Sequence, residues 1–309
     1  MGNQAQAVGI LRPDASDRRH SFLARAQRSL TQNRAGLFGL IGVMVVIIAA
    51  FAAPLLAPHD PLDQDLQLRL QPPAWIDGGN WSYPLGTDQL GRDILSRIIF
   101  GSRISLQASV GVILVVVLFG APLGLIAGYF GGKVDELIMR LADMVLAFPS
   151  YLLAIAIIAS LGPSLLNALI AVSVPWWPWY TRLMRSQVLS IKELQFVESA
   201  HAIGVSQWRI MFRHILPNCL SPIIVQATLD MGYIILSVAS LGFLGLGTQP
   251  PTADWGVMVS DGREFFMTQW WISTFSGGAI FLTVMAFNLV GDGIREAMDP
   301  KIRWRFQKN

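Results

Sequence analysis

The residues of this chain that could carry chemistry do not form a recognisable catalytic set. A glycine pair and lysine at 131–133 suggest a phosphate loop, but position 127 is alanine and position 134 is valine, so the G-x4-G-K-[ST] spacing fails. The four histidines are scattered, and neither an H-E-x-x-H pattern nor a cysteine pair accompanies them. No Ser-His-Asp set can be assembled convincingly. We therefore expect no catalytic residue, no metal site and no cofactor bound by this chain.

The most informative spacing lies in a polar segment between two long apolar runs. Residues 194–203 are predicted to form a short helix, and Gly204 is expected to end it with a positive φ. Ser206 is then placed to cap a second short helix, which Pro217 is expected to stop as the next apolar run begins. The predicted product is an elbow of two short helices lying across a membrane face.

An elbow of this kind favours contact with another protein. Small Ala200 and Ala202 would permit close approach, and Glu198 would offer one charge to an arginine or backbone amide of the partner. The alternative from the residues alone is an amphipathic helix that rests on lipid headgroups. The residues expected to make the contact are Glu198, Ser199, Ala200, Gly204, Ile215, Leu216 and Pro217.

Composition indicates a polytopic membrane protein. Hydrophobic residues make up 53% of the 309 positions and charged residues only 14%, whereas soluble domains carry about 25% charged residues. Because a spanning helix needs roughly 20 apolar residues, six spans fit the chain. The fold class predicted is all-α, with six transmembrane helices and a cytoplasmic loop between the fourth and fifth. The six predicted apolar runs are 37–56, 104–130, 137–161, 165–180, 219–246 and 271–290.

The distribution of basic residues predicts which loops face the cytoplasm. With the N-terminus inside, the head holds six Lys and Arg, the link at 131–136 and its flank two, the long loop five and the tail five. That places 18 of the 23 basic residues inside, so the positive-inside rule predicts that both termini are cytoplasmic. The net charge of +3 is accordingly interpreted as membrane orientation and not as nucleic-acid binding.

These runs divide the chain into predicted segments. A basic head, the first span, an outer insert, a core of five spans and a cytoplasmic tail follow one another. The core includes the elbow loop and a second outer loop. In chain order the boundaries are 1–34, 35–57, 58–101, 102–296 and 297–309, with the elbow loop at 190–217 and the second outer loop at 247–270.

The elbow resembles the "EAA" loop of ABC-importer permeases. That pattern runs Glu-Ala-Ala, three residues, Gly, then Ile-x-Leu-Pro at a fixed distance, and it is matched by Glu198, Ala200, Gly204, Leu216 and Pro217. Two positions depart from it. Ser199 replaces the second motif residue, and His214 stands where the pattern has isoleucine, with Ile215 one position later.

Further segments are similar to the C-type permease of the oligopeptide/dipeptide/nickel branch of this family, and the resemblance covers about residues 30 to 302. The matching residues are Leu85-Gly86-Thr87-Asp88, Gly91-Arg92-Asp93, Ser96-Arg97, Gly101, Gly242 to Gly247, Pro250-Pro251, Trp255-Gly256, Gly291-Asp292-Gly293 and Asp299-Pro300-Lys301.

The resemblance implies a function and a set of partners. The chain would be a permease subunit of an ATP-driven, binding-protein-dependent importer in a bacterial inner membrane, and it would catalyse no reaction of its own. Its partners would be a second homologous permease, two ATP-binding subunits that hold ATP and Mg²⁺, an extracytoplasmic solute-binding protein and membrane lipid. The solute would be a peptide, a nickel complex, glutathione or a sugar. Contact with an outer partner is expected near Asp88, Arg92, Asp93 and Trp255.

Two aspartates within apolar runs leave alternatives open. Asp230, near the middle of the fifth run, either faces the translocation pathway or the paired permease, or is a hydrogen-bonded packing residue. Asp143 is expected to pack or to pair with Arg140. The alternative function is an ion-coupled secondary transporter that uses Asp230 as a relay. Gly120, Gly124 and Gly128, spaced four apart, predict a close-packing face, within the subunit or across a permease pair.

Overall fold

The computed structural model describes residues 34–298, and every regular element within this range is a helix. The basic head before residue 34, the tail from 299 and the match at Asp299-Pro300-Lys301 lie outside the described residues. The helices are α2 Arg34–Phe51, α3 Ala53–Leu56, η1 Leu66–Leu68, α4 Ile94–Phe130, α5 Gly132–Leu146, α6 Ser150–Leu161, α7 Leu165–Lys192, α8 Gln195–Ala202, α9 Gln207–Arg209, η2 Ile210–Ile215, α10 Leu216–Phe243, α11 Trp255–Gly262, η3 Arg263–Phe265 and α12 Trp271–Met298.

The all-α, polytopic fold class is confirmed. Four described helices are long and apolar enough to cross a membrane: α2, α4, the continuous helix 207–243 and α12. The bent pair of α5 and α6 raises that number to five. Helix α7 has 28 residues, which suffices in length, but the polar and charged residues of its second half lower its hydropathy. The predicted number of six spans therefore stays a prediction, as do the predicted segment boundaries.

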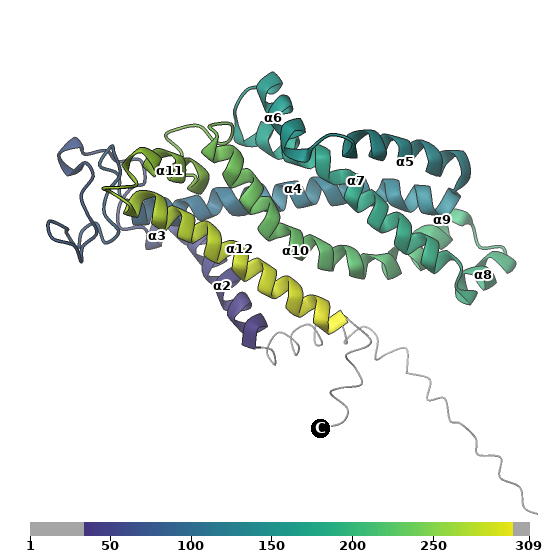
Figure 1. The fold of residues 1–309 in the computed structure, drawn as a ribbon. Coiled ribbons are helices and arrows are strands. Elements are labelled where there is room, and N and C mark those ends of the chain that lie inside the picture. The colour runs from purple at the N-terminus through teal and green to yellow at the C-terminus, as the bar shows by residue number, and fades with distance from the viewer. Residues whose placement is uncertain (1–33, 299–309) are drawn as a thin grey trace, which may run out of the picture.

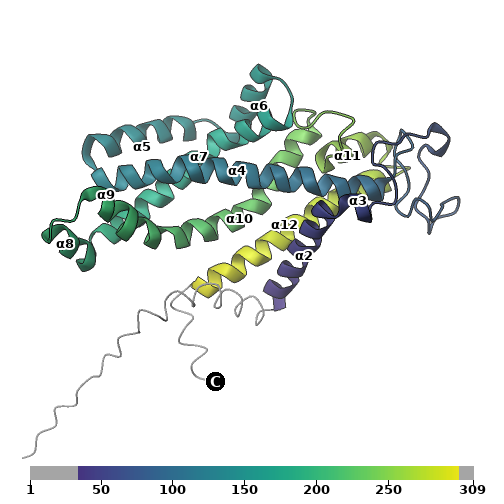
Figure 2. The same ribbon diagram turned by 180° about the vertical axis from the view of Figure 1, so that it is seen from behind.

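Helices α4, α7 and α10 enclose the main apolar core (Figures 1 and 2). The glycines at positions 120, 124 and 128 of α4 lie directly on α7. A Cβ atom on Gly124 would come within 2.2 Å of the Thr181 carbonyl oxygen, and one on Gly120 within 2.6 Å of the Trp177 carbonyl oxygen. The Thr181 hydroxyl also donates a hydrogen bond of 2.9 Å to the Gly120 carbonyl. The predicted close-packing face is thus used within the subunit.

Several helices differ in extent from the predicted runs. Helix α4 begins at Ile94, ten residues before the predicted start, because the Asp93 carboxylate accepts a hydrogen bond from the Ser96 amide at 2.9 Å and caps the first turn. The third run is not one helix. It bends by 84° between α5 and α6, where Pro149 disfavours helical geometry at Phe148.

The fourth and fifth runs are longer than predicted. Helix α7 continues to Lys192 through Pro175 and Pro178, as prolines in membrane helices are tolerated when neighbouring helices satisfy the backbone. Pro217 does not stop the second elbow helix. It comes just after the π-helical turn Ile210–Ile215, and residues 207–243 form one continuous helix that includes it.

The two candidate functional regions lie at opposite ends of this bundle. Figures 1 and 2 place α8 at one end of α4, and the insert before α4 together with α11 at the other. Helix α2 lies along α12, and their contact buries Val43, Ala286 and Val290. Arg103, near the start of α4, donates a hydrogen bond of 2.5 Å to the Ala50 carbonyl of α2. The C-terminal end of α2 is thereby fixed to α4.

Candidate coupling site and outer polar cluster

Helix α8 is attached to the body of the subunit by two side chains. Val197 and Ala200 are buried and belong to the main core, together with Ile210, Met211 and Ile215 of the following helical segment. The small side chain of Ala200 therefore permits close packing within this chain, and not close approach of a partner as its sequence position suggested. Ala202 is exposed and keeps that predicted role.

The end of α8 has the geometry predicted for Gly204. Its φ is +76°, the Val205 amide donates to the Ala200 carbonyl at 3.1 Å, and the Gly204 amide donates to the His201 carbonyl at 3.0 Å. This pair of hydrogen bonds is a Schellman motif, which needs a residue in the left-handed region. A Cβ atom on Gly204 would meet nothing within 4 Å, so backbone conformation alone requires glycine here.

The face of α8 that does not pack on the core presents polar side chains to solvent. Glu198, Ser199 and His201 are exposed, and the Glu198 carboxylate has neither an ion pair nor a hydrogen bond within residues 34–298. Ile203, just after the helix, is 80% exposed. The elbow thus leaves both a charged and an apolar side chain exposed on the surface of this chain.

The second arm of the elbow is a π-helical turn that joins α9 to α10. It spans Ile210–Ile215. Ser206 makes no side-chain cap at the start of α9, contrary to the expectation from sequence. Ile215 is buried, Leu216 is half-buried and Pro217 is exposed, so the Leu-Pro part of the motif forms the base of α10. The π turn keeps the elbow and α10 in one helix, and π turns are frequent at functional sites.

Ring contacts connect the elbow to the end of α4. Tyr129 stacks on His201 with 6.4 Å between ring centroids, and Phe130 meets Trp208 edge-on at 6.2 Å. Lys192, the last residue of α7, donates a hydrogen bond of 3.1 Å to the Gly128 carbonyl. The elbow is therefore held by α4 and α7 as well as by its own continuation into α10.

Asp230 lies in a buried hydrogen-bond network inside the bundle. The Tyr180 hydroxyl of α7 donates to its carboxylate at 2.7 Å, and the Gln226 amide nitrogen donates at 2.9 Å. The Tyr180 hydroxyl comes from α7, whereas Gln226 and Asp230 both belong to α10, so the network holds α7 against α10. This geometry supports the packing alternative, whereas a role for Asp230 in the pathway or as an ion relay stays a prediction.

Asp143 does not pair with Arg140, as the sequence suggested. Its carboxylate forms an ion pair with Arg182 of α7, and Arg140 pairs instead with Glu136 one turn away at 2.5 Å. A charged side chain facing lipid at the centre of a spanning helix costs about 2.5–3.5 kcal/mol. Sequence reasoning missed Arg182 because 39 residues separate it from its partner.

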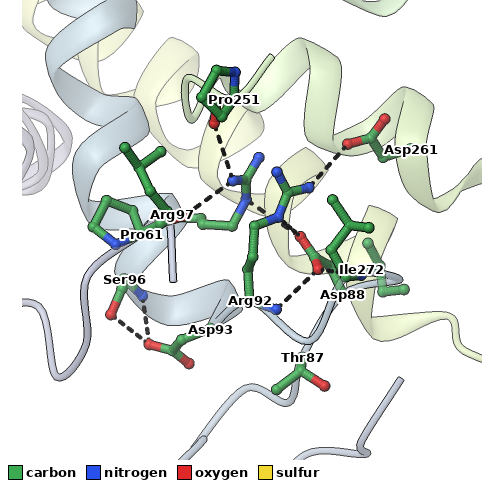
Figure 3. Close-up of polar contacts among 12 residues, drawn as sticks. Pro61, Thr87, Asp88, Arg92, Asp93, Ser96, Arg97, Pro251, Asp261 and Ile272 are labelled. Atoms are coloured by element: carbon green, nitrogen blue, oxygen red, sulfur yellow. Dashed lines mark hydrogen bonds and ion pairs between the residues drawn. The ribbon is translucent and has the colours of Figure 1, made fainter. Parts of the chain in front are cut away.

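The outer cluster consists of buried charges at the start of α4 (Figure 3). The Asp88 carboxylate accepts the Arg92 Nε–H at 2.7 Å and lies 3.5 Å from the Arg97 Nε. The other side of Arg92 faces Asp261 of α11 at 3.7 Å, and the Arg97 guanidinium reaches the Pro61 carbonyl at 3.2 Å. The cluster thus fastens the first insert and α11 to α4.

The residues predicted to contact an outer partner are buried here. Asp88, Arg92 and Asp93 are 3%, 3% and 1% exposed, and Trp255 is 2% exposed. Trp255 lies against Gly101, where a Cβ atom would come within 2.6 Å of the indole, and it donates to the Ile98 carbonyl at 2.9 Å. Their own side chains therefore contact this chain, and partner contact in their vicinity stays a prediction.

Two carboxylates of the second outer loop have raised pKa values. Burial raises the pKa of Asp261 above its usual range, and the Gln89 amide and Arg92 charge offset part of the shift. Burial likewise raises the pKa of Asp254, although the amides of Gly256 and Val257 donate to it at 2.8 and 3.2 Å as a helix cap. Both groups serve the attachment of α11.

Comparison with known proteins assigns the family. The family of binding-protein-dependent transport system inner membrane components matches residues 120–304, and the N-terminal transmembrane domain of oligopeptide transport permease C matches residues 21–73. This chain belongs to the binding-protein-dependent permease family. The first match includes the elbow, and the second includes α2. The resemblance to ABC-importer permeases, which was based on the EAA loop and the C-type segments, is therefore confirmed.

Relatives of this permease cover nearly the whole chain. The dipeptide transport system permease protein DppC of Haemophilus influenzae is 47% identical over 272 residues, which are 88% of this chain and 92% of that protein. The di/tripeptide permease protein DppC of Pseudomonas aeruginosa is 44% identical over 276 residues (89% and 91%). The glutathione permease protein GsiD of Pectobacterium atrosepticum is 43% identical over 282 residues (91% of each).

A solved structure supports the fold of the permease. A chain from inward-facing crystals of the MetNI methionine ABC transporter aligns with a TM-score of 0.52 over 67% of this chain and 98% of its own length. Its sequence identity is 15%, so the likeness concerns the fold alone. The family match and these relatives identify the permease as an ABC-importer membrane subunit of the bacterial inner membrane.

Proposed function

We propose that this chain is one of two permease subunits of an ATP-driven importer of short peptides. The dipeptide and di/tripeptide names of relatives that cover most of the chain support this substrate class. The chain would form half of the translocation pathway, and a second homologous permease would form the other half. A binding protein on the outer side would deliver the peptide, and both termini would be cytoplasmic, as the 18 inward basic residues favour.

The geometry of α8 is the observation that carries the proposal. Its inner face is fixed in the core by Val197 and Ala200, while its outer face presents Glu198 without a partner in the described chain. A helix with one attached face and one free face can be moved by a protein that binds the free face. We infer that two ATP-binding subunits, which hold ATP and Mg²⁺, bind these faces and that this chain catalyses no reaction.

The physical role of this chain is to supply two conformations of the pathway. Closure of the ATPase pair would displace α8, and the displacement would pass to α7 and α10 because both share the core that holds α8. The ATPases bias the equilibrium only as far as they bind one conformation more tightly than the other. On the outer side, the buried cluster around Asp88 would keep the insert and α11 in position for the binding protein.

Co-purification from the native membrane tests the composition of the assembly. The tagged chain, extracted in a gentle detergent, is expected to bring a second permease and an ATP-binding subunit, identified by mass spectrometry. A binding protein in the same eluate would give a direct route to the substrate. Recovery of the chain alone, stable and without an ATPase, would contradict the proposal and would direct attention to Asp230 as a relay.

Two substitutions test the coupling face of α8. Glu198→Lys reverses the free charge, and Gly204→Trp places a bulky side chain where the backbone is left-handed and the surroundings are open. We expect both variants to insert in the membrane and to lose peptide uptake and ATPase co-purification. Glu193→Lys, an exposed charge reversal just before α8, serves as the control and should retain both. Uptake at the wild-type level in both test variants would refute the assignment of α8.

A further inference from the structure

A hollow on the surface of this chain lies between the three helices α6, α7 and α10. Its volume is about 250 Å³, and it is partly open to its surroundings. Pockets that enclose a whole small ligand measure about 300–1,000 Å³, so this hollow suits one chemical group of a larger molecule. Its polar and aromatic lining consists of Ser150 and Tyr151 of α6, Trp176 of α7, and Tyr233 and Ser237 of α10. All nine lining residues belong to the described chain, and none of them is charged.

Two aromatic rings form adjoining walls of the hollow. The rings of Trp176 and Tyr233 lie 5.0 Å apart between centroids at an angle of 85°, so they meet edge to face. Tyr233 and Tyr151 are 42% and 40% exposed, which leaves part of each ring uncovered by this chain. The face of an aromatic ring carries a partial negative charge. The hollow therefore presents a negative potential although its nine described lining residues are uncharged.

Three hydroxyl groups of the hollow donate their hydrogens within this chain. The Ser237 hydroxyl donates to the Tyr233 carbonyl at 2.9 Å, so in its 3.1 Å contact with Tyr151 the tyrosine is the donor. Tyr233 and Tyr151 are also hydrogen-bond partners through their side chains. Because Tyr151 already donates to Ser237, the Tyr233 hydroxyl is the donor in that pair. All three hydroxyl hydrogens are thus used, and the oxygens are left to accept.

This inventory of donors and acceptors selects among the groups that could occupy the hollow. A carboxylate would meet ring faces and acceptor oxygens, and both repel a negative charge. An alkyl group would cover the tyrosine oxygens and leave their acceptor positions unpaired, which costs free energy. An ammonium group donates N–H bonds to those oxygens and is attracted to the ring faces. The lining therefore favours a cation that carries N–H groups.

We propose that this hollow, lined by Tyr151, Trp176 and Tyr233, binds the terminal ammonium group of the solute that the importer carries. The inference rests on the proposed function, since a short peptide bears an ammonium group at one end. The volume of the hollow admits that end and leaves the rest of the peptide outside. Attraction between a cation and ring faces is modest where the site is partly open, so the solute can also leave.

Protection of a cysteine tests the site on the assembled importer of permeases and ATPases, without added binding protein. Ser150→Cys places a thiol at an exposed position of the lining, and uncharged N-ethylmaleimide is the reagent. At about pH 7, alaninamide is mostly an ammonium ion, since its amino group has a pKa of about 8. Lactamide is the same molecule with a hydroxyl in place of the ammonium group. Alaninamide should slow the labelling at a concentration at least about tenfold lower than lactamide does.

Equal protection by the two compounds, or protection by neither, would overturn the ammonium site. Labelling is measured on this chain by mass spectrometry, and the wild-type chain, with its single buried Cys219, gives the baseline rate.

Dialanine and lactoyl-alanine repeat the comparison with peptides. Dialanine should protect Ser150→Cys at the lower concentration of the two. Protection by alaninamide but not by dialanine would refute the link between the hollow and the carried solute. These rates do not depend on uptake, so the peptide proposal is tested separately. A wild-type importer that takes up no dialanine would refute that proposal whatever the labelling shows.

Substitutions in the Ser150→Cys background separate ligand contact from packing. Trp176→Leu keeps an apolar side chain but removes the ring, and it should raise the alaninamide concentration for half protection at least about tenfold. Trp176→Phe keeps a ring and should raise this concentration less. Trp179→Leu, at an exposed position of the same helix outside the lining, is the control and should leave it unchanged. Equal values for Trp176→Leu and Trp176→Phe would refute the ring contact.

Tyr233→Phe provides a second test, should Trp176→Leu fail to assemble. It keeps the ring and removes one of the oxygens that would accept the N–H groups of the ammonium. The alaninamide concentration for half protection should rise, whereas that for lactamide should change less. An unchanged alaninamide value would contradict the proposal.

Discussion

Replacing Gly124 by alanine places a methyl group in the contact between α4 and α7. The new Cβ atom would lie 2.2 Å from the Thr181 carbonyl oxygen and 2.8 Å from the Met184 Cβ. Ordinary contacts begin at 3.4 Å, so the two helix backbones would have to separate by the difference, 1.2 Å. Backbone atoms of packed helices cannot turn aside as a flexible side chain can, so the whole contact must move.

The expected cost combines two terms. Overpacking of a close contact costs about 1–3 kcal/mol, and loss of the neighbouring Thr181 hydrogen bond to Gly120 adds about 0.5–1.5 kcal/mol. Removing a glycine from a helix returns about 0.5–1 kcal/mol. We therefore expect Gly124→Ala to lower the free energy of unfolding by about 0.5–4 kcal/mol.

A matched control is available on the same helix. Gly111→Ala would meet only the flexible Leu169 side chain, at 3.3 Å, so the gain in helix propensity should roughly cancel a small adjustment. The assay is thermal unfolding of the purified importer in one detergent, with both variants and the wild type measured side by side. The midpoint for Gly124→Ala should be lower than both of the others. A midpoint equal to or above that of Gly111→Ala would refute the close backbone contact between α4 and α7.

Two further substitutions test buried polar groups in the same unfolding assay. Tyr180→Phe removes the hydroxyl that donates to a buried carboxylate and should cost about 1.5–3 kcal/mol, whereas Tyr129→Phe removes a buried hydroxyl that has no partner in the described chain and should cost little. Equal effects of the two would contradict the network. Asp88→Asn leaves the buried Arg92 without its nearest counter-charge and should cost about 3–5 kcal/mol, while the exposed Asp77→Asn should be neutral. A stable Asp88→Asn importer would show that the outer cluster is dispensable.

Local features of the fold could be predicted from the sequence because they depend on neighbouring residues. The left-handed backbone at Gly204 follows from a short apolar pattern that ends in glycine, and the structure has a φ of +76° there. The short helix before it was placed within one residue of its observed bounds. Four of the apolar runs likewise located the helices that are long and apolar enough to span a membrane, since hydrocarbon thickness sets their length.

Features that depend on distant residues could not be predicted. Asp230 accepts its hydrogen bond from Tyr180, 50 residues away, and Asp143 takes its ion pair from α7 and not from its own helix. The pattern around Asp88 indicated polarity but not burial, because only the fold brings Asp261 of the second outer loop onto Arg92. Helix patterns also failed to show that the elbow helix continues through Pro217 into α10, since a proline that a helix accommodates and a proline that stops a helix look alike in sequence.

The length of α4 has a mechanical consequence. Its 37 residues extend about 56 Å, nearly twice the thickness of the hydrocarbon core. One end carries Trp255 of the outer loop, and the other end meets Trp208 of the elbow through Phe130. Rotation of such a rod by about 10° about its cytoplasmic end would displace the outer end by about 10 Å. If a partner bound at the elbow rotated this helix, a small angular change there would be magnified into a displacement at its other end comparable to the width of a helix.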